Sequence, residues 1–219
     1  MDTRITFTQA LEKLRHDVLD MASRAEDNLG KALAALKNND RELAKEVKDN
    51  DAIINAKQLE IEDETSICIA TQQPVAGDLR EMVTIFKITG SLERVGDHAV
   101  HLAKAAIKLS KDPPFRAIEH IEKMAETGQE MLRSSIGAFL AKDAAEARRV
   151  AEMDTIIDTE HKLLTEELLE LIKKQKVNVK KAVRLLNTSG YLERLGDHIT
   201  NICESIIYMI EAKHVELND

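Results

Sequence analysis

The sequence predicts an all-α protein made of two tandem, sequence-related antiparallel three-helix bundles. The first reason is an internal duplication: Gly90-Ser-Leu-Glu-Arg-Val-Gly-Asp-His98 returns as Gly190-Tyr-Leu-Glu-Arg-Leu-Gly-Asp-His198, identical at seven of nine positions. The second is composition, because only three prolines and eight glycines accompany abundant Ala, Leu, Glu and Lys, which favour helix. The third is that the few helix-breaking clusters divide the chain into long segments with helical periodicity.

The first half contains three such segments. In residues 5–37 apolar residues recur mainly at steps of three and four, which predicts an amphipathic helix. A second helix is expected up to about residue 71, with Asp40 as its N-cap and Gln72-Gln73-Pro74 as its end. A third is expected over residues 78–110, through the repeated motif, and Asp112-Pro113-Pro114 stops it.

The second half repeats this order, with helices expected over about residues 115–141, 144–173 and 179–213. In the middle helices of the two halves, Asp40 aligns with Asp143. In the last helices, Gly90 aligns with Gly190, which is a smaller offset along the chain. The turn that joins the middle helix to the last helix is therefore shorter in the second half. Long helices joined by short turns form antiparallel bundles. The sequence therefore predicts two repeats, residues 1–112 and 113–219, that join at the double proline.

Composition excludes several classes of function. The net charge of −8, without a strongly basic stretch, argues against a nucleic-acid partner. No apolar run approaches the roughly 20 residues that cross a bilayer, and the amino terminus lacks a signal-peptide pattern, so no membrane insertion is expected. Cys68 and Cys203 form no CxxC unit and are expected to be buried, reduced thiols of a cytoplasmic protein.

Paired acids inside the repeated motif are the first candidate for chemistry. Glu93 and Asp97, like Glu193 and Asp197, stand four residues apart, which places both carboxylates on one helix face. Like charges in this position repel by roughly 0.2–0.5 kcal/mol on an exposed surface. Because both halves retain the unfavourable pair, we expect a cation to compensate it.

The middle helices supply a second pair in each half. Asp51 and Asn55 are four residues apart and align with Asp154 and Asp158. The middle and last helices are neighbours in an antiparallel bundle, so each repeat is expected to bring up to four oxygen-bearing side chains to one region. Such ligands suit Mg²⁺, Mn²⁺ or Ca²⁺, or iron in clusters with hydroxide or water.

Glycine and histidine complete the motif. Gly96 and Gly196 lie inside helices, where glycine costs about 0.5–1 kcal/mol relative to alanine, which predicts close approach of another helix or a ligand. His98 and His198 point about 100° away from the acids on a helix and are expected to lie on the surface or around the metal ligands.

These features together resemble the PhoU family of bacterial phosphate-transport accessory and phosphate-regulon regulatory proteins. The resemblance rests on the duplicated plan, on Asp78-Leu79-Arg80 opening the third helix, and on Glu-Arg-x-Gly-Asp-His in both halves. It implies a cytoplasmic, commonly homodimeric protein that is not an enzyme. Such proteins dampen phosphate-starvation signalling when phosphate is plentiful, by contacting the sensor histidine kinase and the ATPase of the phosphate ABC transporter.

The resemblance also implies a cofactor, because some family members bind multinuclear iron or zinc clusters through E/D-x-x-x-D motifs. In this chain those motifs fall on Glu93/Asp97, Glu193/Asp197 and Asp154/Asp158. The first repeat departs from the pattern at Asn55, and Asn178 stands where the first repeat has Asp78. One site is therefore expected to bind metal more weakly, or to hold fewer ions, than the other.

Two alternatives remain open from the residues. A di-iron oxidase or ferritin-like iron store would need two Glu-x-x-His units on separate helices, and only Glu211-Ala-Lys-His214 is present. A metal-free helical adaptor would instead direct its acid pairs at basic residues of a partner. Phosphate itself would need a basic or N–H-lined pocket, and the sequence reveals none.

Overall fold

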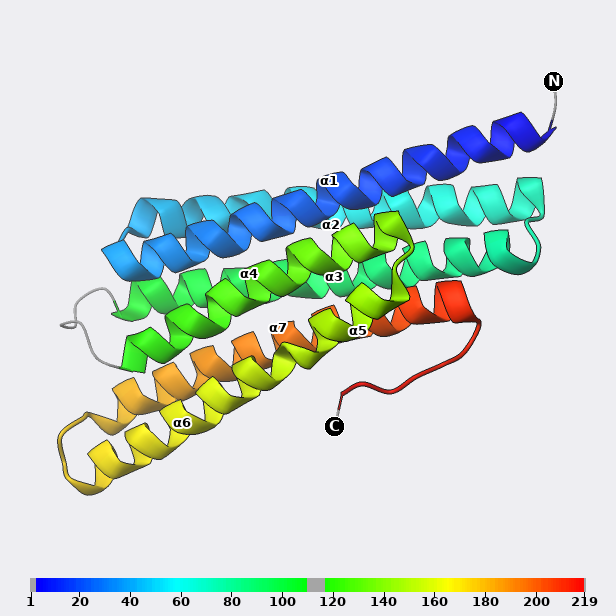
Figure 1. The fold of residues 1–219 in the computed structure, drawn as a ribbon. Helices are drawn as coiled ribbons and strands as arrows, with labels where there is room; N and C mark the ends of the chain where they lie inside the picture. Colours follow the sequence, from blue (N-terminus) through cyan, green and yellow to red (C-terminus); the bar gives the residue numbers. More distant parts are fainter. Residues whose placement is uncertain (1–2, 110–116, 219) are drawn as a thin grey trace.

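The computed structural model describes residues 3–109 and 117–218, and the described chain is helical without strands (Figure 1). The join at Pro113-Pro114 and the start of the fourth helix at Phe115 lie outside these residues. The helices are α1 (Thr3–Asn38), α2 (Arg41–Gln72), α3 (Ala76–Leu109), α4 (Ala117–Ala141), α5 (Ala144–Glu152), α6 (Asp154–Lys173) and α7 (Val179–Glu211).

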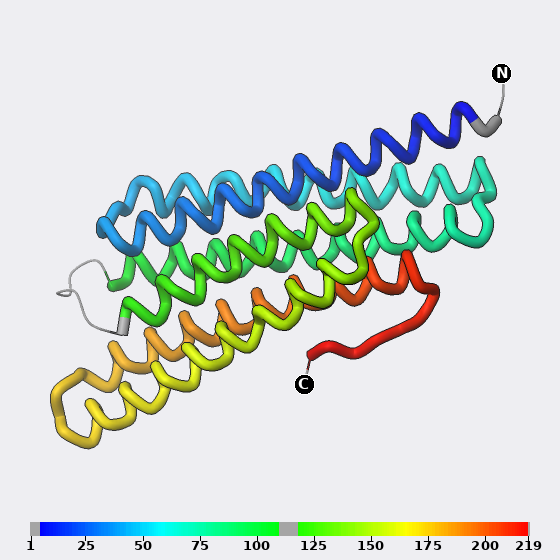
Figure 2. The backbone as a smooth tube through the Cα atoms, viewed as in Figure 1, coloured from blue at the N-terminus to red at the C-terminus, as the bar shows by residue number. Residues whose placement is uncertain are grey.

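Two three-helix bundles form as predicted. In the first, α1, α2 and α3 all contact one another, and in the second α4 packs with α7 and with the consecutive helices α5 and α6 (Figure 2). The predicted N-cap of the first bundle, Asp40, is present, and the second bundle has an equivalent cap. The Asp40 carboxylate accepts the backbone N–H groups of Glu42 and Leu43, both at 3.0 Å, and Asp143 caps α5 in the same way.

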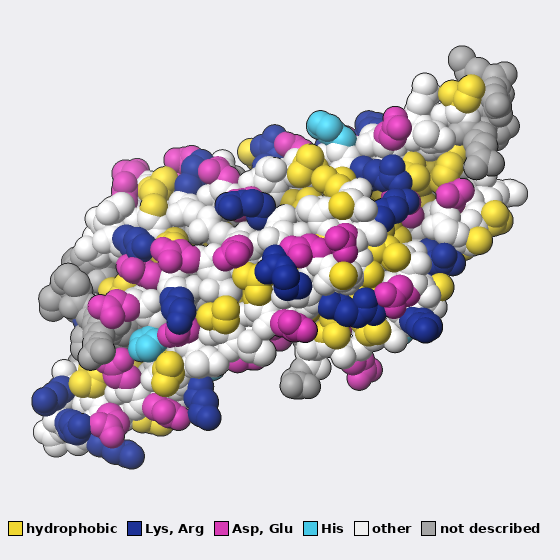
Figure 3. All heavy atoms as spheres, viewed as in Figure 1, with side chains coloured by type: hydrophobic (Ala, Val, Ile, Leu, Met, Phe, Trp, Pro, Cys, Tyr) yellow, Lys and Arg dark blue, Asp and Glu magenta, His cyan; other side chains and the backbone are white. Residues whose placement is uncertain are grey.

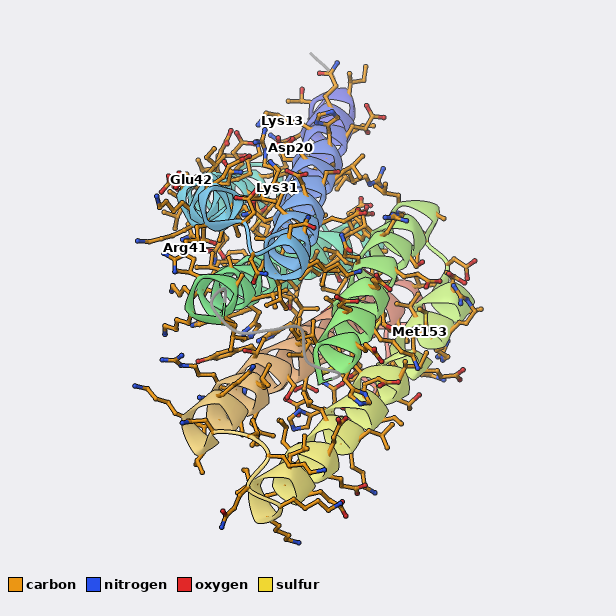
Figure 4. The ribbon with its side chains drawn as sticks, turned by 90° about the vertical axis from the view of Figure 1, so that its left-hand side faces the viewer. Lys13, Asp20, Lys31, Arg41, Glu42 and Met153 are labelled. Carbon is orange, nitrogen blue, oxygen red and sulfur yellow. The ribbon has the colours of Figure 1, made fainter. Side chains whose placement is uncertain are left out.

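The middle helix of the second bundle differs from the expectation of one continuous helix over residues 144–173. It breaks at Met153, which ends α5 and lies at the junction with α6 (Figure 4). The Met153 N–H bonds to the Val150 carbonyl at 3.1 Å, a tightened turn of the kind found at helix ends. The break makes Asp154 the first residue of α6, where it is buried.

Other boundaries shift slightly. The third helix begins at Ala76, before the predicted Asp78, and the last helix ends at Glu211, before Lys213. It ends there because Ala212 adopts a left-handed conformation with φ of 56°. Asn178, noted as a departure between the repeats, serves as the N-cap of α7 and accepts the Lys180 N–H at 2.8 Å.

The core follows the predicted helix faces. The apolar stripe of α3 is completely buried, at Ile85, Ile88, Leu92, Val95 and Leu102. Both cysteines are free and buried as expected, and burial raises the pKa of Cys203 to about 12. No helix in the described ranges has an apolar segment long enough to cross a membrane.

The two bundles pack through equivalent helices, α1 against α4 and α3 against α7. Across the α3/α7 seam, the Thr84 hydroxyl donates to the Ser205 carbonyl at 3.1 Å and Arg80 donates to the Met209 carbonyl at 3.3 Å. His98 stacks on His198 in this seam, with ring centroids 5.5 Å apart. These contacts relate the two repeats by an approximate twofold axis.

Of the two positions expected for His98, the structure excludes the surface, because only 8% of the residue is exposed. The other, a position around the metal ligands, stays a prediction. The position of His98 opposite the equivalent helix of the other repeat explains the burial. Burial, followed by the charge of His198, lowers the pKa of His98 to about 4. The ring is consequently neutral at physiological pH and acts as a packing element of the seam.

Candidate metal-binding sites

The second repeat gathers its four predicted residues around one cavity of about 500 Å³, between the start of α6 and the middle of α7. The middle helix contributes Asp154 and Asp158, and the last helix contributes Glu193 and Asp197. They meet because α6 and α7 pack together and because the acids on each helix are four residues apart. The structure thus brings together the residues that the sequence predicted.

Asp154 is the most perturbed acid of this cavity. Only 9% of the residue is exposed, and its Oδ1 atom is buried without a hydrogen-bond partner. Its Oδ2 atom accepts a long hydrogen bond from the Thr200 hydroxyl, at 3.3 Å. Burial, followed by the charges of Asp158 and Asp197, raises its pKa to about 7. A metal ion that displaced the proton would relieve both the burial cost and the missing partner.

Two further acids of the cavity have raised pKa values. Burial, followed by the charge of Asp197, raises the pKa of Glu193. Burial, followed by the charge of Asp158, raises the pKa of Asp197, and Arg194 and His198 only partly oppose the rise. The described cations near the cavity therefore leave it with excess negative charge, the condition under which a carboxylate cluster binds a hard cation.

The first repeat places its predicted residues in the equivalent position. The Oδ1 atoms of Asp51 and Asn55 are both buried without a hydrogen-bond partner. Burial, followed by the charge of Asp97, raises the pKa of both Asp51 and Glu93. Arg94 neutralises this group only in part, since it lies 3.3 Å from an oxygen of Glu93 and from an oxygen of Asp97.

Sequence reasoning missed Glu62 at the first site. Its charge contributes to the raised pKa of Glu93, and its Oε1 accepts a hydrogen bond from Gln58 at 2.9 Å. Glu62 lies two helical turns beyond Asn55, on the same face of α2, and this spacing is the signal that could have revealed it. The alignment of the repeats pairs it with Thr165, so the first site gains a carboxylate where Asn55 loses one.

The repeated glycines hold the middle and last helices together at both sites, as predicted from their position inside helices. A Cβ atom on Gly96 would lie 3.4 Å from Asp51 Oδ1, and one on Gly196 would lie 2.0 Å from Asp154 Oδ1. Each glycine therefore admits a carboxylate into the helix interface, where the Oδ1 atom of the aspartate is buried.

The carboxyl-terminal segment adds a feature that periodicity did not reveal. Leu217 and Asn218 line the second cavity, where Asn218 donates to the Asp197 carbonyl at 3.4 Å and the Leu217 N–H donates to Glu204 at 2.7 Å. In Figure 1 this segment runs back from the end of α7. It covers part of the second site.

The acids do not form a preset coordination sphere. Within residues 3–109 and 117–218, no group of three or more His, Cys, Asp and Glu side chains is already arranged to hold a metal ion. The unpartnered oxygens of Asp51, Asn55 and Asp154 nevertheless fit a hard cation in donor chemistry. Coordination would require the exposed or half-buried acids of α3 and α7 to rotate toward these buried oxygens.

Comparison with known proteins shows which family has this architecture. The sequence profile of the PhoU domain matches residues 18–106 and, a second time, residues 121–206. The chain belongs to the PhoU family. The two matched segments begin at aligned positions of α1 and α4 and end at aligned positions of α3 and α7, in agreement with the internal duplication.

Individual PhoU proteins match nearly the whole chain. A phosphate-specific transport system accessory protein PhoU homolog of Clostridium acetobutylicum is 38% identical over 99% of this chain and 100% of the relative. The crystal structure of PhoU from Pseudomonas aeruginosa superposes with a TM-score of 0.90 at 31% identity, covering 94% of this chain and all of that one. The phosphate transport system regulatory protein PhoU of Streptococcus pneumoniae also gives a TM-score of 0.90, at 30% identity over 96% and 99% of the two chains.

Proposed function

We propose that this PhoU-family protein is a cytoplasmic regulatory accessory protein of phosphate uptake and phosphate-starvation signalling. The observation that carries the proposal is the full-length identity of 38% to a phosphate-specific transport system accessory protein, with both repeats present. The site itself supports binding as the mode of action. Its acids and amide lie at helix faces. Among the described residues that line the second cavity, no nucleophile and base are arranged for bond cleavage.

The partners we propose are the sensor histidine kinase and the ATPase of the phosphate ABC transporter, with a homodimer as the working assembly. The names of the relatives, which refer to a phosphate-specific transport system, support the transporter as partner. The face seen in Figure 3 mixes acidic and basic side chains without a continuous basic surface, which favours protein partners over nucleic acid there.

We further propose that both acid sites bind metal, with iron or zinc as the candidates and one or more ions in each. The buried oxygens without partners and the raised pKa values support this proposal. A bound cation would neutralise the acids and join the middle helix to the last helix of each bundle. The residues proposed to hold it are Asp51, Asn55, Glu93, Asp97, Asp154, Asp158, Glu193 and Asp197.

The regulatory proposal is tested with a phosphate-starvation reporter in the source organism grown in phosphate-rich medium. Deletion of the gene is expected to raise reporter expression, because the kinase would no longer be held in its repressing state. A plasmid-borne wild-type copy serves as the control and is expected to restore repression. An unchanged reporter in the deletion strain would contradict the proposed function.

A further inference from the structure

A small basic cavity, separate from both acid sites, lies in the seam between α3 and α7. Its volume is about 110 Å³, and we refer to it as the seam pocket. The first repeat contributes His101, Lys104 and Lys108 from the end of α3, and the second contributes Arg184 from the beginning of α7. Residues far apart in the sequence therefore place four basic side chains around one opening.

The charge of this pocket is unusual for the protein. The chain carries a net charge of −8, yet no aspartate or glutamate lines the seam pocket. Lys104 and Lys108 form no ion pair with any described residue, and Arg184 is held in place by donating to the Lys108 carbonyl at 3.4 Å. Two of its cations also act on the first acid site, since the charges of Lys104 and His101 oppose the rise in the pKa of Asp51. Positive charges grouped in this way repel one another unless an anion lies between them.

Neutral polar groups complete the lining. Asn187 and Tyr191 of α7 add an amide and a phenol hydroxyl to the pocket. The Tyr191 ring stacks on His101, with centroids 4.1 Å apart and planes inclined by 17°, which fixes both side chains. The Nδ1 atom of His101 is buried without a hydrogen-bond partner. The pocket thus combines basic side chains with hydrogen-bonding groups.

The internal duplication provides a natural comparison, because the seam has a second pocket at the position related by the repeat. That pocket, of about 370 Å³, has Glu204 where the seam pocket has Lys104, and Lys87 where it has Asn187. Its Arg94 is already engaged with acids of the first metal site. Of these two pockets, as lined by the described residues, the related one contains an acid and the seam pocket contains none.

We propose that the seam pocket binds a small, free tetrahedral oxyanion of the phosphate class. Lys104, Lys108 and Arg184 would hold the charge, because charge-assisted hydrogen bonds to such oxygens are the strong ones. The cavity, of about 110 Å³, has room for a single small ion of this kind. The site does not depend on the proposed partners or metals, and an ion there would join the two repeats.

The test is a calorimetric titration of the purified full-length protein with inorganic phosphate. The protein is first treated with a chelator and dialysed, so that metal-bound phosphate does not contribute. Wild type is expected to bind one phosphate per chain in a saturable manner. Lys108→Ala and Arg184→Ala are each expected to weaken binding at least about tenfold, because each removes a charged contact.

Lys87→Ala is the matched control, since it removes a lysine from the related pocket of the same seam. It is expected to leave phosphate affinity unchanged. Absence of saturable binding by wild type, or equal weakening by Lys87→Ala, would overturn the proposal. Glycerol phosphate binding as tightly as inorganic phosphate would overturn the assignment to a free ion. Circular dichroism verifies that Lys108→Ala, a substitution at an exposed side chain, keeps the helical fold.

Discussion

Replacement of Asp154 by asparagine is expected to stabilise the metal-free protein by about 2–4 kcal/mol at pH 8 and to change its stability little at pH 4. The side chain is buried next to Asp158 and Asp197, which raises its pKa from an ordinary 3.8 to about 7. The unfolded chain therefore ionises this carboxyl more easily than the folded chain does. Folded-state stability is then lost as pH rises from about 4 to about 7, and asparagine removes this loss.

Urea unfolding followed by circular dichroism at pH 4, 6 and 8, in the presence of a chelator, measures this effect. Asn at this position can still accept the Thr200 hydroxyl, so the hydrogen bond of the wild type is retained. Asp49→Asn is the control, because it removes an exposed carboxylate of α2. A free-energy difference between Asp154→Asn and wild type that does not vary with pH would show that the carboxyl is not strained.

Removal of both cations around Glu81 is expected to destabilise the protein by about 3 kcal/mol. Only 3% of Glu81 is exposed, and it pairs with Arg15 of α1 at 2.6 Å and with Lys142, which follows α4, at 2.7 Å. This carboxylate therefore links the two bundles. The double substitution Arg15→Met with Lys142→Met would leave its charge buried and unpaired.

Thermal and urea unfolding of the double variant test this expectation. The matched control adds Glu81→Met to the same background, which removes the buried charge and is expected to recover most of the lost stability. The reason is that a buried charge without a partner costs more than an apolar replacement of all three groups. Equal stability of the double and triple variants would contradict a role for unpaired charge.

Much of this fold was predictable because the information is local to each helix. The duplicated motif revealed two repeats, and caps such as Asp40 marked the helix starts. The spacing of Glu193 and Asp197 placed both carboxylates on one helix face. Gly196, which lies between them inside the helix, indicated that another helix or a ligand approaches closely there. The predicted gathering of acids in the second repeat followed from these patterns together with antiparallel packing.

Features created by packing between the repeats were not predictable in the same way. Helical periodicity identifies a buried face but does not name its neighbour, so the surface stayed one of two positions expected for His98. The seam pocket depends on the contact between α3 and α7, which brings Lys104 and Arg184 together. The break at Met153 also escaped prediction, because no proline or glycine marks it in the sequence.

Metal content measured by elemental analysis, after equilibration with iron or zinc and removal of free metal, tests the central claim most directly. The variants are Glu93→Gln with Asp97→Asn for the first site and Glu193→Gln with Asp197→Asn for the second, with Asp49→Asn as control. Each double variant is expected to lose the metal of its own repeat and to keep that of the other. Bound metal per chain that is the same in all of these proteins as in wild type would contradict metal binding at the duplicated acids.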